Sequence, residues 1–336
     1  MADACFDDLS KRKWTFSMTK DHGPKPDDID PYERQLLPPD GNFDNLVSNW
    51  RRVNSRLTIF LGAGASVGAK NRAGQLLPSA LRLRDEIWLE FMCNDEERRA
   101  FGPNTLGMMT LEHAAALAEA RAGRGAIEEY LTARFDCTRP LWQHAVLPFL
   151  GPKALFTTNY DELIEKGWRL QIGQPKTEEI FLRHNAAHLD SPAPRMSLFK
   201  PHGTMELAAR QIGQGGLVIT MFDYFRMIGD YKGMIERFLS DFNQSCVLFI
   251  GYAFMDMDIG AELFRLRQDR KIPWYAVFPR DDADVRRMYE QKFGILQINR
   301  RSLDFLVELD DRVDFIADKK WKFDQLSNLR GAGLIQ

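Results

Sequence analysis

Three apolar runs in this sequence end abruptly at small or polar residues. The runs begin at Leu57, Ala154 and Cys246, and they lead directly into Gly62-Ala-Gly-Ala-Ser66, Thr157-Thr-Asn-Tyr-Asp161 and Gly251-Tyr252. A continuous apolar run is typical of a strand that is covered on both faces, as in a parallel sheet. Because open α/β sheets bind ligands at the carboxyl ends of their strands, the three patches predict a nucleotide site at one sheet edge.

The rest of the sequence alternates such runs with segments of helical periodicity. Strands are predicted over 57–61, 154–157, 196–199, 217–219, 247–250, 274–278 and 295–298. Helices are predicted over 45–53, 161–170, 224–242, 258–268 and 283–292. Parallel neighbouring strands need a crossover connection, so this alternation predicts a doubly wound, Rossmann-like parallel sheet in an α/β protein.

Two segments stand apart from this alternation. Residues 1–45 are rich in Pro, Asp and Lys and show no sustained period, which predicts an N-terminal arm that is extended or partly disordered. Residues 76–150 keep helical spacing without a convincing strand, which predicts a helical subdomain inserted after the first strand. Residues 46–336 are predicted to form one domain that contains this insertion.

Composition narrows the classes of function. The formal net charge of −2 gives no overall attraction to nucleic acid, which is bound mainly by clustered Lys and Arg. The four cysteines lie far apart without a Cys-x-x-Cys pair, which argues against a zinc ribbon and a disulfide framework. No apolar stretch approaches the roughly 18 residues of a membrane span, and the acidic start lacks a secretory pattern. We therefore expect a cytoplasmic protein with no membrane partner and no direct nucleic-acid partner.

The glycine-containing patches suit a ligand that carries phosphate. Small residues in Gly62-Ala-Gly-Ala-Ser66 let backbone amides approach a pyrophosphate, which the start of a turn or helix attracts. The spacing departs from the Gly-x-Gly-x-x-Gly dinucleotide fingerprint, and a turn that merely packs tightly is the alternative. Later in the chain, Gly251 could clear room for a ribose, and Tyr252 could stack on a base or close the core. Asp258 begins the next predicted helix.

Asn159, Asp161 and His202 are the candidate catalytic residues. The amide of Asn159 can hold a ribose hydroxyl or orient a water molecule, and Asp161 is a candidate ligand group or the cap of the following helix. His202 lies in Lys200-Pro-His-Gly203, where Pro restrains the backbone and Gly leaves open space. We therefore expect the imidazole of His202 to be presented rather than packed.

A metal site is not expected. His184 and His188 stand four residues apart and would share one face if the segment were helical. No acidic third ligand stands at a useful spacing, so the two histidines are not predicted to hold a metal.

Together these residues resemble the sirtuin (silent information regulator) superfamily. Gly62-Ala-Gly-Ala-Ser66 looks like its first NAD-binding motif, Thr157-Thr-Asn-Tyr-Asp161 like its Thr-Gln-Asn-x-Asp patch, and His202-Gly203 like its catalytic His-Gly. Gly251-Tyr-Ala-Phe, with Asp256 and Asp258, is similar to the late nucleotide loop of the same family. Four motifs in the correct order imply a sirtuin-type fold with NAD as the ligand.

Three departures separate the chain from the protein deacetylases of this family. The zinc ribbon of four cysteines is missing, Thr158 replaces the glutamine, and the segment after Ser66 lacks the Gly-Ile-Pro-x-Phe pattern. The Thr-Thr-Asn-Tyr-Asp form with a helical insertion looks like the sirtuin-like domains of bacterial antiphage defence, which hydrolyse NAD. The resemblance therefore implies an NAD hydrolase that releases nicotinamide and ADP-ribose and depletes the NAD of an infected cell.

The resemblance also implies roles for single residues. Asn159 would bind the ribose and orient the attacking water, His202 would act as general base, and Asp161 would hold the loop or the ribose. The residues expected to bind NAD are Gly62, Ala63, Gly64, Ala65, Ser66, Thr157, Thr158, Gly251, Tyr252 and Asp258.

A hydrolase of this kind is toxic when it is always active, so a switch is expected. The resemblance implies a homo-oligomer and an activator from a neighbouring gene, such as an Argonaute-like protein, a hexameric ATPase or a nucleoside-triphosphate pyrophosphatase. Two alternatives stay open: a module that binds NAD or ADP-ribose without turnover, and an NAD-dependent protein deacylase.

Overall fold

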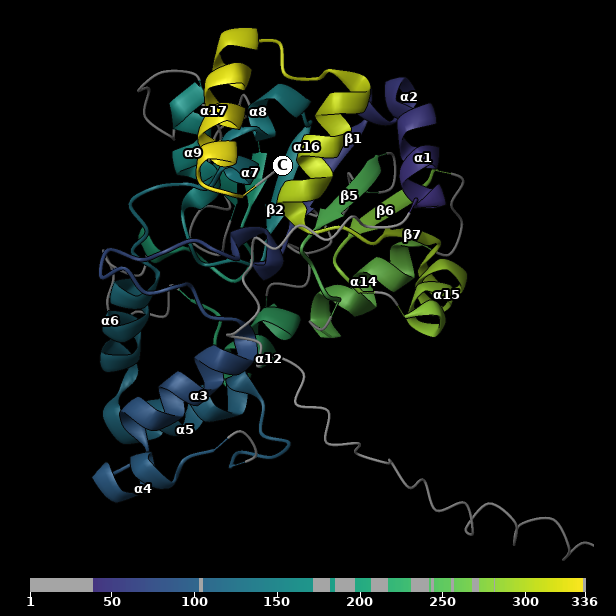
Figure 1. Cartoon of the computed structure of the whole chain (residues 1–336). Helices are drawn as coiled ribbons and strands as arrows, with labels where there is room; N and C mark the ends of the chain where they lie inside the picture. Colours follow the sequence, from purple (N-terminus) through teal and green to yellow (C-terminus); the bar gives the residue numbers. More distant parts are fainter. Residues whose placement is uncertain are drawn as a thin grey trace, which may run out of the picture.

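The computed structural model describes residues 39–102, 105–171, 182–184, 197–206, 217–230, 242, 245–254, 257–267, 272–280 and 282–334. In this part of the chain seven strands form one sheet in the order β3-β4-β2-β1-β5-β6-β7 (Figure 1). The strands are β1 (Leu57–Leu61), β2 (Ala154–Thr157), β3 (Leu182–His184), β4 (Ser197–Phe199), β5 (Cys246–Ile250), β6 (Trp274–Val277) and β7 (Ile295–Ile298). Every neighbouring pair is parallel.

The strand order reverses at β1. After β1 the chain forms β2, β3 and β4 on one side of it, with β4 lying between β2 and β3, and then β5, β6 and β7 on the other side. Such a reversal is the switch point at which doubly wound sheets bind ligands, outside the carboxyl ends of the strands. The doubly wound parallel sheet predicted from the sequence is therefore confirmed.

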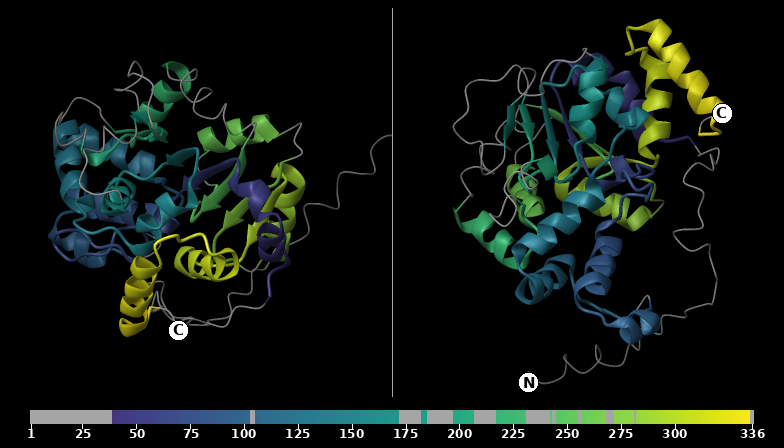
Figure 2. Two further views of the ribbon diagram at one scale, coloured as in Figure 1. Left: turned by 90° about the horizontal axis from the view of Figure 1, so that it is seen from above. Right: turned by 90° about the vertical axis from the view of Figure 1, so that its left-hand side faces the viewer.

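Helices cover both faces of the sheet (Figure 2). Because side chains alternate along a strand, Ile59 points to one face and Phe60 to the other. The face of Ile59 is covered by α1 (Gly41–Ser48), α2 (Trp50–Asn54), α7 (Trp142–Ala145), α8 (Leu147–Leu150), α9 (Leu163–Gln171), α16 (Ser302–Val313) and α17 (Lys319–Gly331). The face of Phe60 is covered by α14 (Met257–Arg267) and α15 (Ala283–Phe293).

Four helices between β1 and β2 form what we call the helical insert: α3 (Ala80–Phe91), α4 (Asp95–Ala100), α5 (Leu111–Ala122) and α6 (Arg124–Phe135). They lie apart from the sheet, and α5 packs beside α12 (Met221–Asp230) (Figure 1). A third core cluster joins α3, α5 and α6 to Tyr160, Met205, Leu217 and Ile219. The insert thus packs on loops that follow β2 and β4, whereas α7 and α8 pack on the sheet. The division of the chain into domains stays a prediction.

Several predicted elements differ in the structure. Leu217 forms only an isolated antiparallel bridge to Gly203, so the strand predicted over 217–219 is wrong. The helix predicted over 45–53 is two helices, the first beginning at Gly41 because Asp40 accepts hydrogen bonds from two amides of its first turn. The strand β3 and the helices α16 and α17 were not predicted.

The two histidines considered for a metal do not share a helix. His184 belongs to the strand β3, and His188 lies outside the described residues. Among the described residues, no group of three or more His, Cys, Asp or Glu side chains is arranged to hold a metal ion. No described helix has both the length and the apolar character needed to span a membrane.

Candidate functional site

The turn after β1 packs backbone to backbone against the turn after β5. The amide of Gly62 donates to the carbonyl of Ile250 at 3.0 Å, and the amide of Gly64 donates to that of Gly251 at 2.8 Å. A Cβ on Gly62 would lie 2.5 Å from the Gly251 oxygen, and one on Gly251 would lie 2.3 Å from the Ala65 nitrogen. Close packing therefore explains these glycines, and the Gly64 amide is already used within the protein.

This turn forms a short 3₁₀ helix, η1 (Ala63–Ser66), whose outer and inner sides differ. Ala63 is exposed, Gly64 is half-buried, and Ala65 and Ser66 are buried. The exposed side therefore carries no polar side chain, and the one polar side chain of the turn, that of Ser66, is buried.

Asn159 connects the loop after β2 to the turn after β1. Its backbone amide donates to Thr157 Oγ1 at 3.0 Å, which turns the chain at the end of the strand. Its side-chain Nδ2 donates to the Gly62 carbonyl at 3.1 Å and to Ser66 Oγ at 3.2 Å. These bonds fix the plane of the amide at the carboxyl ends of β1 and β2, beside half-buried Thr158.

Asp161 also binds the turn after β1. Its carboxylate accepts a hydrogen bond from Ser66 Oγ at 2.9 Å and another from the amide of Leu163, the first residue of α9, at 3.1 Å. The second bond is the helix-start interaction that was one of the two alternatives for Asp161. In this structure Asp161 therefore fixes a loop, a serine and a helix start together.

His144 is a further member of this cluster that sequence reasoning missed. Its Nε2 lies 3.4 Å from Ser66 Oγ. Because the single hydroxyl proton of Ser66 is donated to Asp161, Nε2 of His144 is assigned as the donor in this contact. Burial lowers the pKa of His144 to about 4, and the charge of Asp161 offsets only part of this effect. The imidazole is therefore neutral at pH 7.

The strand register brings the His202 loop beside the Asn159 loop. Phe156 of β2 is paired with Phe199 of β4, and Asn159 and His202 each follow their paired residue by three positions. The amide of Met205 donates to the carbonyl of Tyr160 at 3.1 Å, which ties the two loops. The two candidate catalytic residues thus lie on adjacent loops at one edge of the sheet.

A buried lysine also links these two loops. The Nζ of Lys200, which is fully buried, donates to the carbonyl of Asp161 at 2.6 Å and to Glu165 Oε1 on α9 at 3.1 Å. An ammonium group without exposure is costly unless it is paired, and here a carboxylate and a carbonyl compensate it. Lys200 lies in the Lys200-Pro-His-Gly203 motif, but the sequence did not predict that its side chain connects the two loops.

The expectation that His202 is presented is wrong. The residue is 3% exposed, and its ring packs edge-on against the ring of Tyr224 on α12, with centroids 5.2 Å apart. A turn closed by the bond from the Gly203 amide to the Lys200 carbonyl, with φ of 87° at Gly203, places the imidazole under α12. The backbone carbonyl of His202 accepts a hydrogen bond from the Val218 amide at 3.0 Å.

Tyr252 and Asp258 are the remaining predicted residues. Tyr252 is 3% exposed and packs in the core against Phe60 and Phe249, with centroids 4.3 Å and 6.1 Å away, so its ring closes the core. Asp258 lies in α14, but its side chain is outside the described part, as is Asp256 entirely. The structure thus brings together Gly62, Ser66, Asn159, Asp161 and His144 in one cluster, with His202 on the neighbouring loop.

The sheet and this cluster of residues together define the class of protein. It is a doubly wound α/β protein whose polar residues converge at the carboxyl ends of the strands. Within it, residues 153–298 match the family model of the SIR2-like domain. The match runs from the residue before β2 to the end of β7, so it includes Asn159, Asp161 and His202 and leaves out the turn after β1. It supports a sirtuin-like domain in this part of the chain.

One solved structure, described as the structural basis for the mechanism and regulation of Sir2 enzymes, is similar with a TM-score of 0.46 and 12% sequence identity. The superposition covers 81% of this chain and 97% of that chain. No curated protein matches the sequence.

Proposed function

We propose that this protein is an NAD hydrolase that cleaves the bond between nicotinamide and ribose to give nicotinamide and ADP-ribose. The observation that carries the proposal is the register of β2 and β4, which sets Asn159 and His202 on adjacent loops at the ligand-binding edge of the sheet. The match of residues 153–298 to the SIR2-like domain, which includes both residues, supports NAD as the ligand.

Cleavage of the bond between nicotinamide and ribose requires mainly that the protein positions the reacting groups. The nicotinamide of NAD is already cationic, so it leaves without a general acid, and the ribose develops oxocarbenium character. The protein has to hold the ribose and deliver water in the correct orientation. Asn159 suits this task because its Nδ2 is fixed by Gly62 and Ser66, which leaves Oδ1 as the acceptor for a ribose hydroxyl or a water molecule.

His202 is proposed as the general base toward the ribose or the attacking water. Tyr224 packs against its ring, so substrate binding has to displace the Tyr224 side chain. Asp161 acts indirectly in this scheme, since its carboxylate orients Ser66, which in turn holds Asn159.

The motif resemblance supports a role in antiphage defence, with an oligomer or a neighbouring-gene activator as the switch. The need to uncover His202 is consistent with an enzyme that rests in an inactive state. In infected cells that carry this protein, NAD should then fall in the wild type and persist in the Asn159→Ala variant.

The direct test incubates the full-length protein with NAD, with and without the product of its neighbouring gene, and measures nicotinamide and ADP-ribose by chromatography. Asn159→Ala should lower turnover by at least about 100-fold, since misplacement of the reacting groups alone costs that much. Asn328→Ala, which removes an exposed asparagine from α17, is the matched control and should keep the wild-type rate.

Three outcomes would contradict the proposal. Binding of NAD without nicotinamide release under every condition would identify a binding module. Release of nicotinamide only with an acylated lysine peptide would identify a deacylase. Near-wild-type turnover by Asn159→Ala in an active assembly would remove Asn159 from the mechanism.

A further inference from the structure

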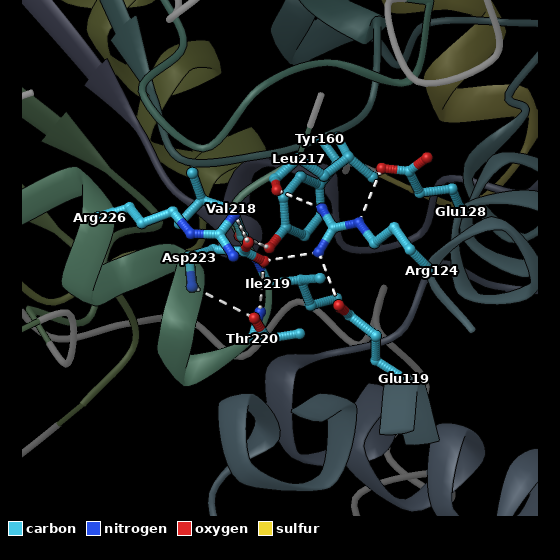
Figure 3. A network of polar contacts seen from close by, with 10 residues as sticks. All are labelled: Glu119, Arg124, Glu128, Tyr160, Leu217, Val218, Ile219, Thr220, Asp223 and Arg226. Atoms are coloured by element: carbon cyan, nitrogen blue, oxygen red, sulfur yellow. Dashed lines mark hydrogen bonds and ion pairs between the residues drawn. The ribbon is translucent and has the colours of Figure 1, made fainter. Parts of the chain in front are cut away.

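Arg124, at the start of α6, joins the helical insert to residues 217–223 (Figure 3). Within the insert its guanidinium donates to Glu119 at 3.1 Å and to Glu128 at 2.9 Å. Outside the insert it donates to Asp223 on α12 at 2.7 Å and to the Leu217 carbonyl at 2.5 Å. Burial disfavours the charge, but the bonds to Asp223 and Glu128 outweigh it and raise the pKa of Arg124 above its ordinary value.

Asp223 extends this contact into the backbone. Its Oδ2, which accepts from Arg124, also accepts the amides of Ile219 at 3.2 Å and Thr220 at 2.9 Å. In return the Asp223 amide donates to Thr220 Oγ1 at 3.2 Å, which closes the first turn of α12. The guanidinium thus holds both ends of a segment that runs from Leu217 to Asp223.

This segment and the residue after it contact His202 at its backbone and at its ring. The amide of Val218 donates to the His202 carbonyl at 3.0 Å, and Tyr224, one residue after Asp223, packs on the imidazole. The hydroxyl of Tyr160 donates to the Val218 carbonyl at 2.7 Å, so the loop after β2 reaches the same residue. Movement of residues 217–223 would therefore displace His202 relative to Asn159.

We propose that Arg124 is a positioning residue, by which the helical insert sets the place of His202 for the reaction through residues 217–223. The inference rests on the proposed function, and it adds a residue that lies in another element and touches none of the predicted site residues. When substrate displaces the Tyr224 side chain, the bonds of Arg124 keep the backbone of residues 217–223, which contacts His202, in place.

The chemistry of arginine explains why this residue type is needed. The planar guanidinium offers five N–H donors, and in Arg124 four hydrogen bonds run from it to three carboxylates and one carbonyl. Lysine offers one nitrogen and cannot reach all four acceptors at once. Arg124→Lys should therefore restore only part of what Arg124→Met removes.

Arg134 supplies a matched control. It is as deeply buried as Arg124, with side-chain exposures of 6% and 12%, and pairs with Glu86 at 2.7 Å. Its remaining described bond goes to the Leu76 carbonyl at 2.7 Å, so it stabilises the insert without touching residues 217–223. Arg124→Met removes three ion pairs, whereas Arg134→Met removes the one to Glu86, and only Arg124→Met takes a contact away from residues 217–223.

The first measurement is NAD turnover by the active full-length protein. We expect Arg124→Met and Asp223→Asn to lower kcat by about 10- to 100-fold with KM changed less than about threefold, because a misplaced base affects the chemical step. Arg134→Met should stay within about twofold of the wild-type kcat. A kcat of Arg124→Met equal to that of Arg134→Met overturns the inference.

The second measurement is hydrogen exchange of the Val218 amide, which needs no activity. Exchange should rise at least about tenfold in Arg124→Met relative to Arg134→Met at matched stability, because the bond to His202 opens more often. Equal exchange in the two variants overturns the inference even if NAD is hydrolysed. If the wild type never hydrolyses NAD, the proposed function fails, and the exchange comparison still decides whether Arg124 holds His202 in place.

Discussion

His144 shows how one buried side chain can contribute to a site that it does not enter. Its ring lies next to Ser66, and Gln143 beside it donates to the Ala65 carbonyl at 3.0 Å. Behind it, a Cβ on Gly167 of α9 would lie 2.6 Å from the backbone of His144. The helix α7 is thus pressed between α9 and the turn after β1, and the imidazole is fixed as a neutral hydrogen-bond donor.

The lowered pKa of His144 predicts an acid-sensitive stability. The imidazole titrates at about 4 in the folded protein and near 6.5 when unfolded, so its contribution is complete above pH 6.5 and is lost as the pH falls toward 4. As the pH falls from 7.5 to 5.0, protonation of His144 should therefore lower the free energy of unfolding by about 2 kcal/mol. His144→Gln should lack this part of the pH dependence, which urea unfolding at the two pH values would measure.

His113→Gln, which replaces an exposed histidine of α5, is the control for the loss of a histidine side chain. Identical pH dependence in His144→Gln and the wild type would mean that His144 carries no depressed pKa.

Residues at strand ends could be predicted, and their partners could not. Asn159 and His202 were found because they follow apolar runs, and the rule for ligand sites in α/β sheets then applies. His144 and Lys200 act through contacts with residues 78 and 35 to 39 positions away, for which a local pattern has no signal. The packing of His202 under α12 is likewise a tertiary contact, whereas the expectation used only its neighbours Pro201 and Gly203.

At the scale of elements, continuous apolar runs located the buried strands well. The bounds of β1, β2 and β7 agree with the prediction, and those of β5 and β6 differ by one residue. The strand β3 has only three residues, including an arginine and a histidine, so no apolar run marked it. The helix α16 has apolar residues at helical spacing, Phe305, Leu306 and Leu309, so a signal was present but was not used.

The contact of two glycine turns at the switch point can be tested by substitution. Gly251 has φ of 66° and no room for a Cβ, so Gly251→Ala combines backbone strain with a clash against Ala65 and Gly64. We expect a loss of about 3 kcal/mol of unfolding free energy, from strain of about 1–2 kcal/mol and overpacking of about the same size. Denaturant unfolding measures the change.

Gly260→Ala is the control for this prediction. Gly260 lies within α14, and a Cβ added there would meet nothing within 4 Å, so alanine should stabilise the helix by up to about 1 kcal/mol. Equal stabilities of Gly251→Ala and the wild type would show that the two turns separate at little cost.

At the scale of the whole molecule, the helical insert and the sheet have separate cores. Clusters on the two faces of the sheet contain β1, β2, β5 and β6, whereas the third cluster contains α3, α5 and α6. The third cluster reaches the rest of the chain through Tyr160, Met205, Leu217 and Ile219, all on loops near the candidate site. The stability of the insert should therefore depend on these loops, while that of the sheet should not.

Tyr160 is the residue at which this separation can be measured. Its ring packs edge-on against Phe135 of α6, with centroids 5.8 Å apart, and its hydroxyl donates to Val218. Tyr160→Ala should cost the insert about 3–5 kcal/mol, which raises hydrogen exchange of amides in α5 and α6 at least about 100-fold. Amides of β1 and β5 should keep their protection.

Tyr160→Phe is the control, because it keeps the ring and removes one hydrogen bond, worth about 1 kcal/mol. In this variant the exchange of amides in α5 and α6 should rise far less. A uniform loss of protection in Tyr160→Ala, equal in the strands and in the insert, would show instead that both parts unfold as one unit.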